Sequence, residues 1–344
     1  MQTIERPAKG FAEPLPSRTH GSADFRVVLS FDVEEHYQIE AARGLALDPC
    51  LKDVYRDRLQ PSVNWILELL EQANIKATFF VVGELAQRQR ALVRAICKGG
   101  HEVASHGWDH QPVTRLSPTG FRADVARSKD VLEQITGARV VGYRAPTFSI
   151  LRETSWAIDV LADVGMRYDS SIYPVRHDRY GIAAAPRAPF LAQRANHTLL
   201  ELPPATWRCL GMNVPVGGGG SFRLFPLWFM KQGLKQIGKL SGPNVAMLYF
   251  HPWEFDPDQP RLPLARLARF RTYVGIKSNR RRLSSLLASY QFVRAVDVAE
   301  NLDMIAAVAL SKYSLEHNGD PAGPVISIRR ENTGEEVNIT PNIA

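Results

Sequence analysis

The sequence predicts a mixed α/β fold in which a buried parallel sheet is surrounded by helices. Segments with strand character alternate with amphipathic helical segments along most of the 344 residues. The strand-like segments are continuously apolar, as in IKATFFVVG at residues 75–83, and such strands are typical of parallel sheets covered on both faces. Neither a phosphate-binding loop nor a GxGxxG motif occurs. An α/β barrel and a doubly wound sheet are both consistent with this pattern.

Strands and helices are expected in regular alternation. The predicted strands are 26–32, 75–83, 101–106, 138–146, 166–171, 198–204 and 245–253. The predicted helices are 61–74, 84–100, 117–137 and 153–165. Pro61 is placed at the start of the first helix and Ser117 at the N-cap of the third. The GGGG run at 217–220 lacks the Lys and Ser or Thr of a phosphate loop and is interpreted as a flexible turn.

The composition indicates a globular protein with one main domain. Residues 1–24 are Pro-rich and polar and are expected to form a flexible arm, the main domain spans 25–311, and 312–344 form a polar tail or a small hairpin. The three cysteines are too few for a disulfide framework. No apolar run approaches the roughly 18–20 residues that span a bilayer, and no secretory signal is seen, so a cytoplasmic location is expected.

The charge balance is basic, with a net charge of +7. Such a balance favours an anionic partner. The basic residues are spread along the chain apart from KSNRRRLSS at 277–285, which is interpreted as a solvated helix face. No nucleic-acid-binding motif is present, so nucleic acid is not an expected partner.

Polar side chains stand at the ends of the predicted strands. They are Asp32, Glu34, His106, Arg144, Asp169 and His251. In parallel α/β folds the carboxyl ends of the strands meet at one edge, where functional sites are built. The sequence therefore predicts a polar site at this edge.

The SHGWDH segment suggests a metal site. His106 and His110 are four residues apart, and on a helical turn both imidazoles face the same way. A carboxylate from VVLSFDVEEHY would complete a set of two histidines and one carboxylate, which leaves coordination positions open for water and substrate. A second carboxylate of that stretch is then available as a base.

Arg144 and His251 are candidates for supporting roles. Arg144 in GYRAP can hold a buried carboxylate through paired hydrogen bonds, and a purely structural ion pair is an equal alternative. His251 follows an apolar strand and can donate a proton near neutral pH.

Together, SFDVEEHY, SHGWDH, GYRAP, YDSSIYP and MLYFHPWE resemble the polysaccharide deacetylases of the NodB-homology type, carbohydrate esterase family 4, over roughly residues 25–300. The segments VGGGGSF and HPWEFDPDQPR look like the subgroup of exosortase/PEP-CTERM exopolysaccharide loci. The resemblance implies a distorted (β/α)7 barrel that removes acetyl groups from N-acetylated sugars of a polysaccharide or oligosaccharide. It also implies that His106 and His110 are metal ligands.

The same resemblance implies roles for other residues of the site. Asp32 matches the catalytic base, Arg144 the residue that orients it, and His251 the general acid. Asp169 matches a polar position that helps hold that end of the site. The implied reaction is the attack of a metal-bound water on the acetamide.

One position departs from the family pattern, which has two adjacent Asp residues. Val33 occupies the second of these positions, where the family has a metal ligand. In an extended strand, residues two apart point the same way, so Glu34 is predicted as the ligand and Glu35 is the fallback. The expected metal is Zn²⁺, with Co²⁺, Ni²⁺ and Mn²⁺ as other divalent metals of this chemistry.

Aromatic side chains near the motifs are candidates for sugar contacts. Trp108, Tyr143 and Trp253 are predicted as substrate residues together with Asp169, with core packing as the alternative for the aromatic ones. Three other functions fit parts of the pattern. They are a metal-dependent hydrolase of small cyclic amides, a non-catalytic polysaccharide-binding module and a non-haem iron oxygenase.

Overall fold

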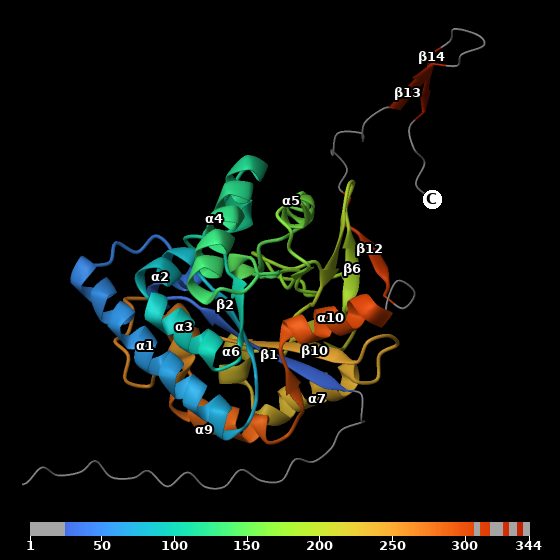
Figure 1. Cartoon of the computed structure of the whole chain (residues 1–344). Coiled ribbons are helices and arrows are strands. Elements are labelled where there is room, and N and C mark those ends of the chain that lie inside the picture. The colour runs from blue at the N-terminus through green and yellow to red at the C-terminus, as the bar shows by residue number, and fades with distance from the viewer. Residues whose placement is uncertain (1–24, 306–309, 317–325, 330–335, 340–344) are drawn as a thin grey trace, which may run out of the picture.

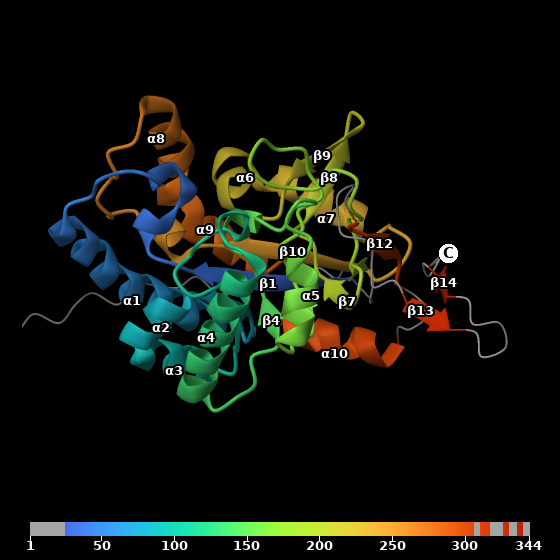
Figure 2. The same cartoon turned by 90° about the horizontal axis from the view of Figure 1, so that it is seen from above.

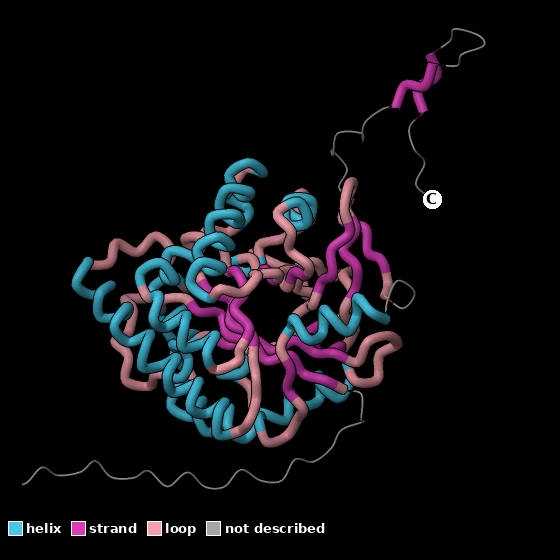
Figure 3. Tube along the Cα trace, viewed as in Figure 1, coloured by secondary structure: helices cyan, strands magenta, loops and turns pink. Residues whose placement is uncertain are grey.

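The computed structural model describes residues 25–305, 310–316, 326–329 and 336–339. Within residues 25–305, most strands gather at the centre and helices lie outside them (Figure 1, Figure 3). The central parallel strands are β1 (Arg26–Val33), β2 (Thr78–Val81), β3 (Glu102–Ser105), β4 (Gly142–Tyr143), β5 (Tyr168–Asp169), β7 (Thr198–Glu201) and β10 (Val245–Phe250). Each lies within one of the predicted strands or extends it by one residue, and the predicted α/β class is confirmed.

The central strands form a ring. Neighbours pair in parallel in the order β10, β1, β2, β3, β4, β5 and β7. The chain after β7 then crosses to β10, where Pro204 forms a parallel bridge with Met247 and the N–H of Ala205 donates to the Met247 carbonyl at 2.9 Å. This bridge joins the two ends of the row of strands, so the arrangement is a barrel.

Helices surround the outside of the barrel and also lie beyond its two ends. They are α1 (Pro49–Gln72), α2 (Gly83–Arg88), α3 (Arg90–Lys98), α4 (Pro118–Thr136), α5 (Ala157–Asp163), α6 (Gly219–Leu224), α7 (Leu227–Ile237), α8 (Arg266–Tyr273), α9 (Ile276–Leu287) and α10 (Ala295–Ile305). In Figure 2, α6 and α8 lie on one side of the strands and α10 lies on the other. The short 3-10 helices are η1 (His36–Gln38), η2 (Glu40–Ala42), η3 (Val113–Arg115), η4 (Pro146–Phe148) and η5 (Pro252–Phe255).

The side-chain alternation of β1 separates an outer core from an inner one. Leu29 belongs to the large cluster that packs against the surrounding helices, whereas Val28 packs with Phe80 in a separate inner cluster. Val298 of α10 joins this inner cluster, so α10 closes the end of the barrel where the strands begin. By the same period of two, Asp32 points inward at the other end of β1. The fold thus delivers a carboxylate to the open end of the barrel.

Two helix predictions need correction. Pro61 does not begin a helix but lies inside α1, which starts at Pro49. The upstream turns form because Tyr55 and Leu59 are buried, and this packing outweighs the hydrogen bond that Pro61 cannot make. The helix predicted over 84–100 is two helices separated at Gln89, whose φ of −114° and ψ of 50° are not helical.

Helix α4 agrees with its prediction. The Ser117 hydroxyl accepts a hydrogen bond from the backbone N–H of Gly120 at 3.1 Å, which is the interaction expected of an N-cap.

The glycine run at 217–220 is not the flexible turn that was predicted. Gly218 pairs with Tyr249 of β10, and its φ of 147° favours glycine. A Cβ atom at Gly218 would lie 1.7 Å from the Tyr249 carbonyl oxygen. The run therefore packs its backbone directly on the strand that precedes His251.

Further strands extend the sheet or stand apart from it. They are β6 (Phe190–Gln193), β8 (Thr206–Cys209), β9 (Met212–Pro215), β11 (Phe292–Val293), β12 (Lys312–Ser314), β13 (Ile326–Arg329) and β14 (Glu336–Ile339). β12 pairs with β6 in the main sheet, although the sequence placed residues 312–314 in a tail. β13 and β14 pair antiparallel as a hairpin.

The arm predicted over residues 1–24 lies outside the described residues. Among the helices of the described part, none has the length and apolar character needed to cross a membrane.

Candidate active site

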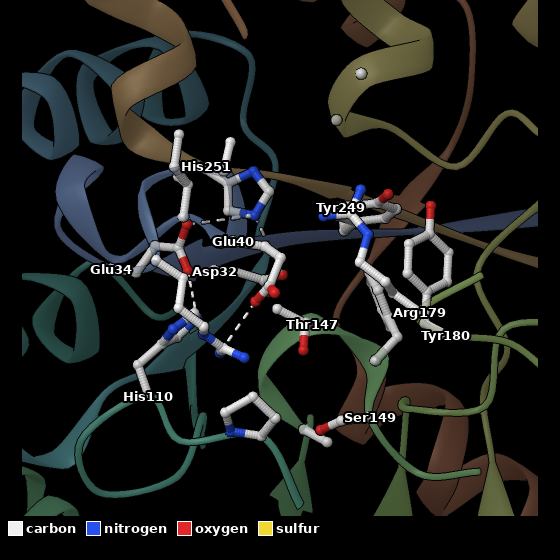
Figure 4. A pocket seen from close by; sticks show the side chains of 18 of the residues that line it. Asp32, Glu34, Glu40, His110, Thr147, Ser149, Arg179, Tyr180, Tyr249 and His251 are labelled. Atoms are coloured by element: carbon white, nitrogen blue, oxygen red, sulfur yellow. Dashed lines mark ion pairs between the residues drawn. The ribbon is translucent and has the colours of Figure 1, made fainter. Parts of the chain in front are cut away.

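The carboxyl ends of the barrel strands open into a cavity of about 580 Å³. Asp32 and Glu34 enter it from the end of β1, His106 and His110 from the segment after β3, and His251 from the end of β10. Figure 4 shows Asp32, Glu34, His110 and His251 grouped in this cavity. Residues far apart in the sequence meet here because parallel strands end at the same edge.

Glu34, His106 and His110 form a cluster with the composition of a metal site. Each is buried and offers one ligand atom, and these atoms all lie within 4.8 Å of one another. His110 Nε2 lies 2.5 Å from Glu34 Oε2. His106 Nδ1 is hydrogen-bonded to the Arg144 carbonyl oxygen at 2.8 Å, so its Nε2 is the atom left for a ligand bond. Burial is the main reason why the pKa of His106 falls to about 4, which keeps the imidazole in its neutral, ligating form.

The two histidines do not share a helical turn, so that part of the prediction is wrong. Residues 106–110 form a loop after β3, with Gly107 at φ 75° and His110 at φ 62°. The Asp124 carboxylate accepts a hydrogen bond from the Trp108 backbone N–H at 2.9 Å. The left-handed residues and this bond curl the loop back on itself, which brings both imidazoles to the same point.

Arg144 fixes the orientation of Asp32 from inside the barrel. Its Nη1 donates to Asp32 Oδ1 at 2.6 Å and to the Ser30 hydroxyl at 2.8 Å. Its Nε and Nη2 donate to the carbonyl and hydroxyl oxygens of Ser170 at 3.2 and 2.9 Å. The guanidinium carbon stands 4.1 Å from the centroid of the Phe80 ring. Both side chains are buried, so the positive charge of Arg144 compensates the negative charge of the Asp32 carboxylate directly.

His251 faces the same group of residues from the end of β10. Its Nε2 lies 3.9 Å from Asp32 Oδ2 and 3.7 Å from Glu34 Oε1. Its Nδ1 is 2.7 Å from Glu254 Oε1, and Glu254 Oε2 accepts a hydrogen bond from Arg223 at 2.5 Å. The ring is thus held through Nδ1, and Nε2 is directed into the cavity.

Sequence reasoning missed Glu254 and Arg223. The signal for Glu254 is its place three residues after His251 in HPWE, where it also accepts a hydrogen bond from the His251 backbone N–H at 3.1 Å. No local pattern indicates Arg223, because it reaches Glu254 from α6 through the tertiary fold.

The charges of the cavity act on one another strongly. Burial by itself would raise the pKa of Glu34, but the imidazoles of His110 and His251 lower it to about 2. Burial likewise opposes the protonation of His251, but the carboxylates of Glu34, Glu254 and Asp32 raise its pKa to about 9. The site therefore stabilises an ionised carboxylate beside a protonated imidazole.

The sequence and the fold match known proteins. The polysaccharide deacetylase family matches residues 52–168, and a domain of unknown function, DUF3473, matches residues 170–300. Over residues 52–168 the chain is therefore similar to polysaccharide deacetylases. It is 30% identical over 95 residues to a peptidoglycan-N-acetylglucosamine deacetylase of Bacillus cereus, an alignment that covers 27% of this chain and 34% of that protein. The chain spans about a third of the length of the first curated relatives that it matches.

Two solved structures share this fold. One, described as a polysaccharide deacetylase of Mycobacterium smegmatis, superposes with a TM-score of 0.57 at 20% identity, over 88% of this chain and 98% of that one. The other is the Puue allantoinase, with a TM-score of 0.54 at 16% identity, over 88% of this chain and 99% of that one. The Mycobacterium smegmatis protein and this allantoinase thus share one barrel architecture with the chain.

In this structure the three residues after Asp32 take different directions. Val33 lies in the outer core, Glu34 enters the cavity, and Glu35 turns away from it. Arg88 donates a hydrogen bond to Glu35 at 3.0 Å, and the Tyr37 hydroxyl donates a second one. Glu35, the fallback ligand, is therefore engaged outside the cluster of Glu34 and the two histidines.

Of the predicted substrate residues, Trp253 lines the cavity. Its ring stacks on His36 with centroids 4.7 Å apart and on His251 at 5.5 Å, and its indole N–H is 3.4 Å from Glu34 Oε1. Trp253 therefore forms a wall beside the catalytic candidates.

The other three predicted substrate residues lie outside the cavity lining, which corrects their placement. Trp108 packs beneath Arg127, whose guanidinium carbon is 3.6 Å from the ring centroid, and Tyr143 is buried in the outer core. Asp169 accepts a hydrogen bond from the Ser171 hydroxyl at 2.5 Å behind the cavity. These side chains support the strand ends and do not face the space where a sugar would bind.

Proposed function

We propose that this chain is a metal-dependent deacetylase that hydrolyses N-acetyl groups of a polysaccharide containing N-acetylhexosamine. One arrangement carries the proposal: a buried carboxylate and two imidazoles lie beside Asp32 in one cavity, and His251 faces the same point. Amide hydrolysis needs a base for the attacking water, stabilisation of the oxyanion and an acid for the departing amine. The similarity to a peptidoglycan-N-acetylglucosamine deacetylase supports the same reaction.

Glu34, His106 and His110 are the residues that would hold the metal. Two imidazole nitrogens and one carboxylate oxygen, all buried and within 4.8 Å, fit a divalent cation and leave positions open at it. We infer Zn²⁺, because imidazole ligands favour it over Mg²⁺ or Ca²⁺. When bound, the cation would supply Lewis-acid chemistry, making water more acidic and stabilising negative charge on the acetamide oxygen.

Asp32 and His251 carry the two proton transfers in this proposal. The water oxygen bonds to the acetyl carbon while its proton passes to Asp32, which Arg144 holds at 2.6 Å. The C–N bond then breaks as the amine nitrogen takes a proton from His251 Nε2. The products are acetate and a free amino sugar. Glu254 keeps the reacting nitrogen of His251 directed at the substrate.

The test replaces the base without removing the metal ligands. Asp32→Asn should lower kcat for acetate release from N-acetylglucosamine oligomers at least about a hundredfold, with bound Zn²⁺ unchanged. The matched control is Asp57→Asn, at an exposed position of α1, which should retain full activity. Full activity in the folded Asp32→Asn variant would remove Asp32 as the base.

The biological setting is also part of the proposal. The segments VGGGGSF and HPWEFDPDQPR support a role in exopolysaccharide biosynthesis, with residues 25–311 as the catalytic domain and the cytoplasm as its location. A small cyclic amide is the competing substrate class. Faster hydrolysis of allantoin than of acetylated oligosaccharides would favour that alternative.

A further inference from the structure

The lining of the cavity is rich in arginine beyond what the proposed reaction uses. Five arginines contribute to it: Arg43, Arg115, Arg179, Arg223 and Arg271. Arg223 is buried and paired with Glu254. The other four stand around the entrance in two groups.

The first group, which we call the first basic edge, consists of Arg43 and Arg115. Arg43 follows η2 in the loop after β1, and Arg115 ends η3 in the segment after β3. Burial lowers the pKa of Arg43, and the positive charge of Arg115 lowers this pKa further. The Glu40 carboxylate, 3.0 Å from the Arg43 guanidinium, acts in the opposite direction. The two guanidinium groups are thus close enough to repel each other.

The second basic edge consists of Arg179 and Arg271. Arg179 lies in the segment after β5, and Arg271 lies in α8, after β10. The positive charges of both act on the same neighbour, His177, whose pKa is lowered by burial and by these two arginines against the opposing charge of Asp178. His177 stacks on Tyr180 of the cavity wall with ring centroids 3.9 Å apart. The two arginines of the second basic edge therefore lie beside the same part of the cavity wall.

The charge of these edges is neutralised only in part within the described chain, where Glu40 pairs with Arg43 at 3.0 Å. Asp32 is balanced by Arg144, and Glu34 by the imidazoles around it. Among the described residues, no carboxylate lies within ion-pair distance of the Arg115 or Arg271 side chain. Arg179 has only Asp178, at 3.8 Å, and the Asp178 side chain is 78% exposed. A cleft with excess positive charge attracts anions, and guanidinium groups bind carboxylate and phosphate in paired hydrogen bonds.

We propose that the two basic edges bind anionic groups on the sugars that flank the reacting N-acetylhexosamine, so that the substrate is an acidic polysaccharide. This inference rests on the proposed deacetylase function and adds the substrate class to it. The groups recognised are carboxylates, as in uronic acids, or phosphates. The two basic edges follow different barrel strands. A polysaccharide with charged sugars on both sides of the reacting sugar therefore contacts both edges, whereas a substrate with a single terminal phosphate contacts one edge.

The first experiment compares substrates of equal length with the metal-loaded protein. Hyaluronan oligosaccharides, in which N-acetylglucosamine alternates with glucuronate, should be deacetylated with a kcat/KM at least about tenfold above that of chitin oligosaccharides. Added NaCl should reduce this advantage, because salt screens exposed charges. N-acetylglucosamine 1-phosphate is the substrate that carries a phosphate in the same comparison.

The second experiment removes each edge in turn. Two double variants are compared, Arg43→Gln/Arg115→Gln and Arg179→Gln/Arg271→Gln. If charged sugars lie on both sides of the reacting sugar, each variant should lower the ratio of kcat/KM for hyaluronan to kcat/KM for chitin oligosaccharides about tenfold. If only one variant affects the phosphate-bearing substrate, the anion is a single terminal group. The matched control, Arg26→Gln/Arg139→Gln, removes two exposed arginines at the opposite end of the barrel strands and should leave the ratio unchanged.

The outcomes separate this inference from the function on which it rests. Equal kcat/KM values for hyaluronan and chitin oligosaccharides, with active protein, would overturn the acidic substrate and leave the deacetylase intact. A preference for the acidic oligosaccharide that both edge variants retain would also overturn it. Release of acetate from none of the substrates would instead count against the proposed function.

Discussion

At the scale of single residues, Glu34 and Glu35 illustrate how adjacent carboxylates serve different parts of the molecule. Glu34 is two residues beyond Asp32, so both carboxylates reach the cavity, as the alternation of an extended chain requires. Glu35 is held by Arg88 at 3.0 Å on the other side. The chemistry of each carboxylate therefore follows from its direction and not from its position in the motif.

Replacing each of these carboxylates by its amide distinguishes the two. Glu34→Gln should weaken Zn²⁺ binding at least about a hundredfold, because it removes the only carboxylate of the cluster formed with His106 and His110. Glu35→Gln should keep Zn²⁺ binding and lose about 1 kcal/mol of stability through its weakened ion pair. Isothermal titration with Zn²⁺ and urea unfolding measure the two effects. A larger loss of affinity in Glu35→Gln would reverse the assignment.

At the scale of elements, the contact of the glycine run with β10 holds the strand that carries His251. The backbone of Gly218 lies directly against the carbonyl of Tyr249, where no side chain fits. A run that looks unstructured in the sequence is thus part of the packing around the site. Local composition could not indicate this, because the contact joins segments that are separated in the chain.

Alanine substitutions in this run should differ sharply by position. Gly218→Ala should lower the free energy of unfolding by about 2 kcal/mol or more, because the added Cβ would meet the Tyr249 carbonyl oxygen at 1.7 Å and φ is 147°. Gly220→Ala should be tolerated, since the nearest atom to its Cβ, from Arg223, is 3.9 Å away. Thermal unfolding of the two variants tests this, and equal melting temperatures would contradict it.

At the scale of the whole molecule, the sequence carried enough information for the barrel strands and for the edge at which the polar residues meet. Continuous apolar runs identify strands buried on both faces, and the residues that end them are necessarily neighbours in a parallel barrel. The loop geometry of His106 and His110 was not predictable, because it depends on left-handed backbone at Gly107 and His110. Partners such as Arg223 and Glu254 come from different elements and require the tertiary fold.

The pH dependence of global stability should report a buried histidine at the start of β3. The pKa of His101 is lowered from 6.5 to about 4, chiefly by burial and further by Lys76 and Arg294. The folded state therefore keeps His101 neutral while the unfolded chain takes up a proton below about pH 6.5. Stability should fall as the pH drops from about 6.5 to about 4, by roughly 3 kcal/mol from this group.

Urea unfolding at pH 7 and pH 4.5 checks this expectation. The variant His101→Gln, whose amide oxygen can still accept the Ala77 N–H, should lose less stability between the two pH values than the wild-type protein does. The same loss in both proteins would show that His101 does not contribute.

The central claim is that this barrel directs water to the carbonyl carbon of an N-acetyl group. The most direct measurement incubates the Zn²⁺-loaded protein with N-acetylglucosamine and hyaluronan oligosaccharides in water labelled with a heavy oxygen isotope, and analyses the products by mass spectrometry. We expect one labelled oxygen in the released acetate, none in the sugar, and one free amine per acetate. A folded, metal-loaded protein that releases no acetate, or that places the label in the sugar, would contradict the claim.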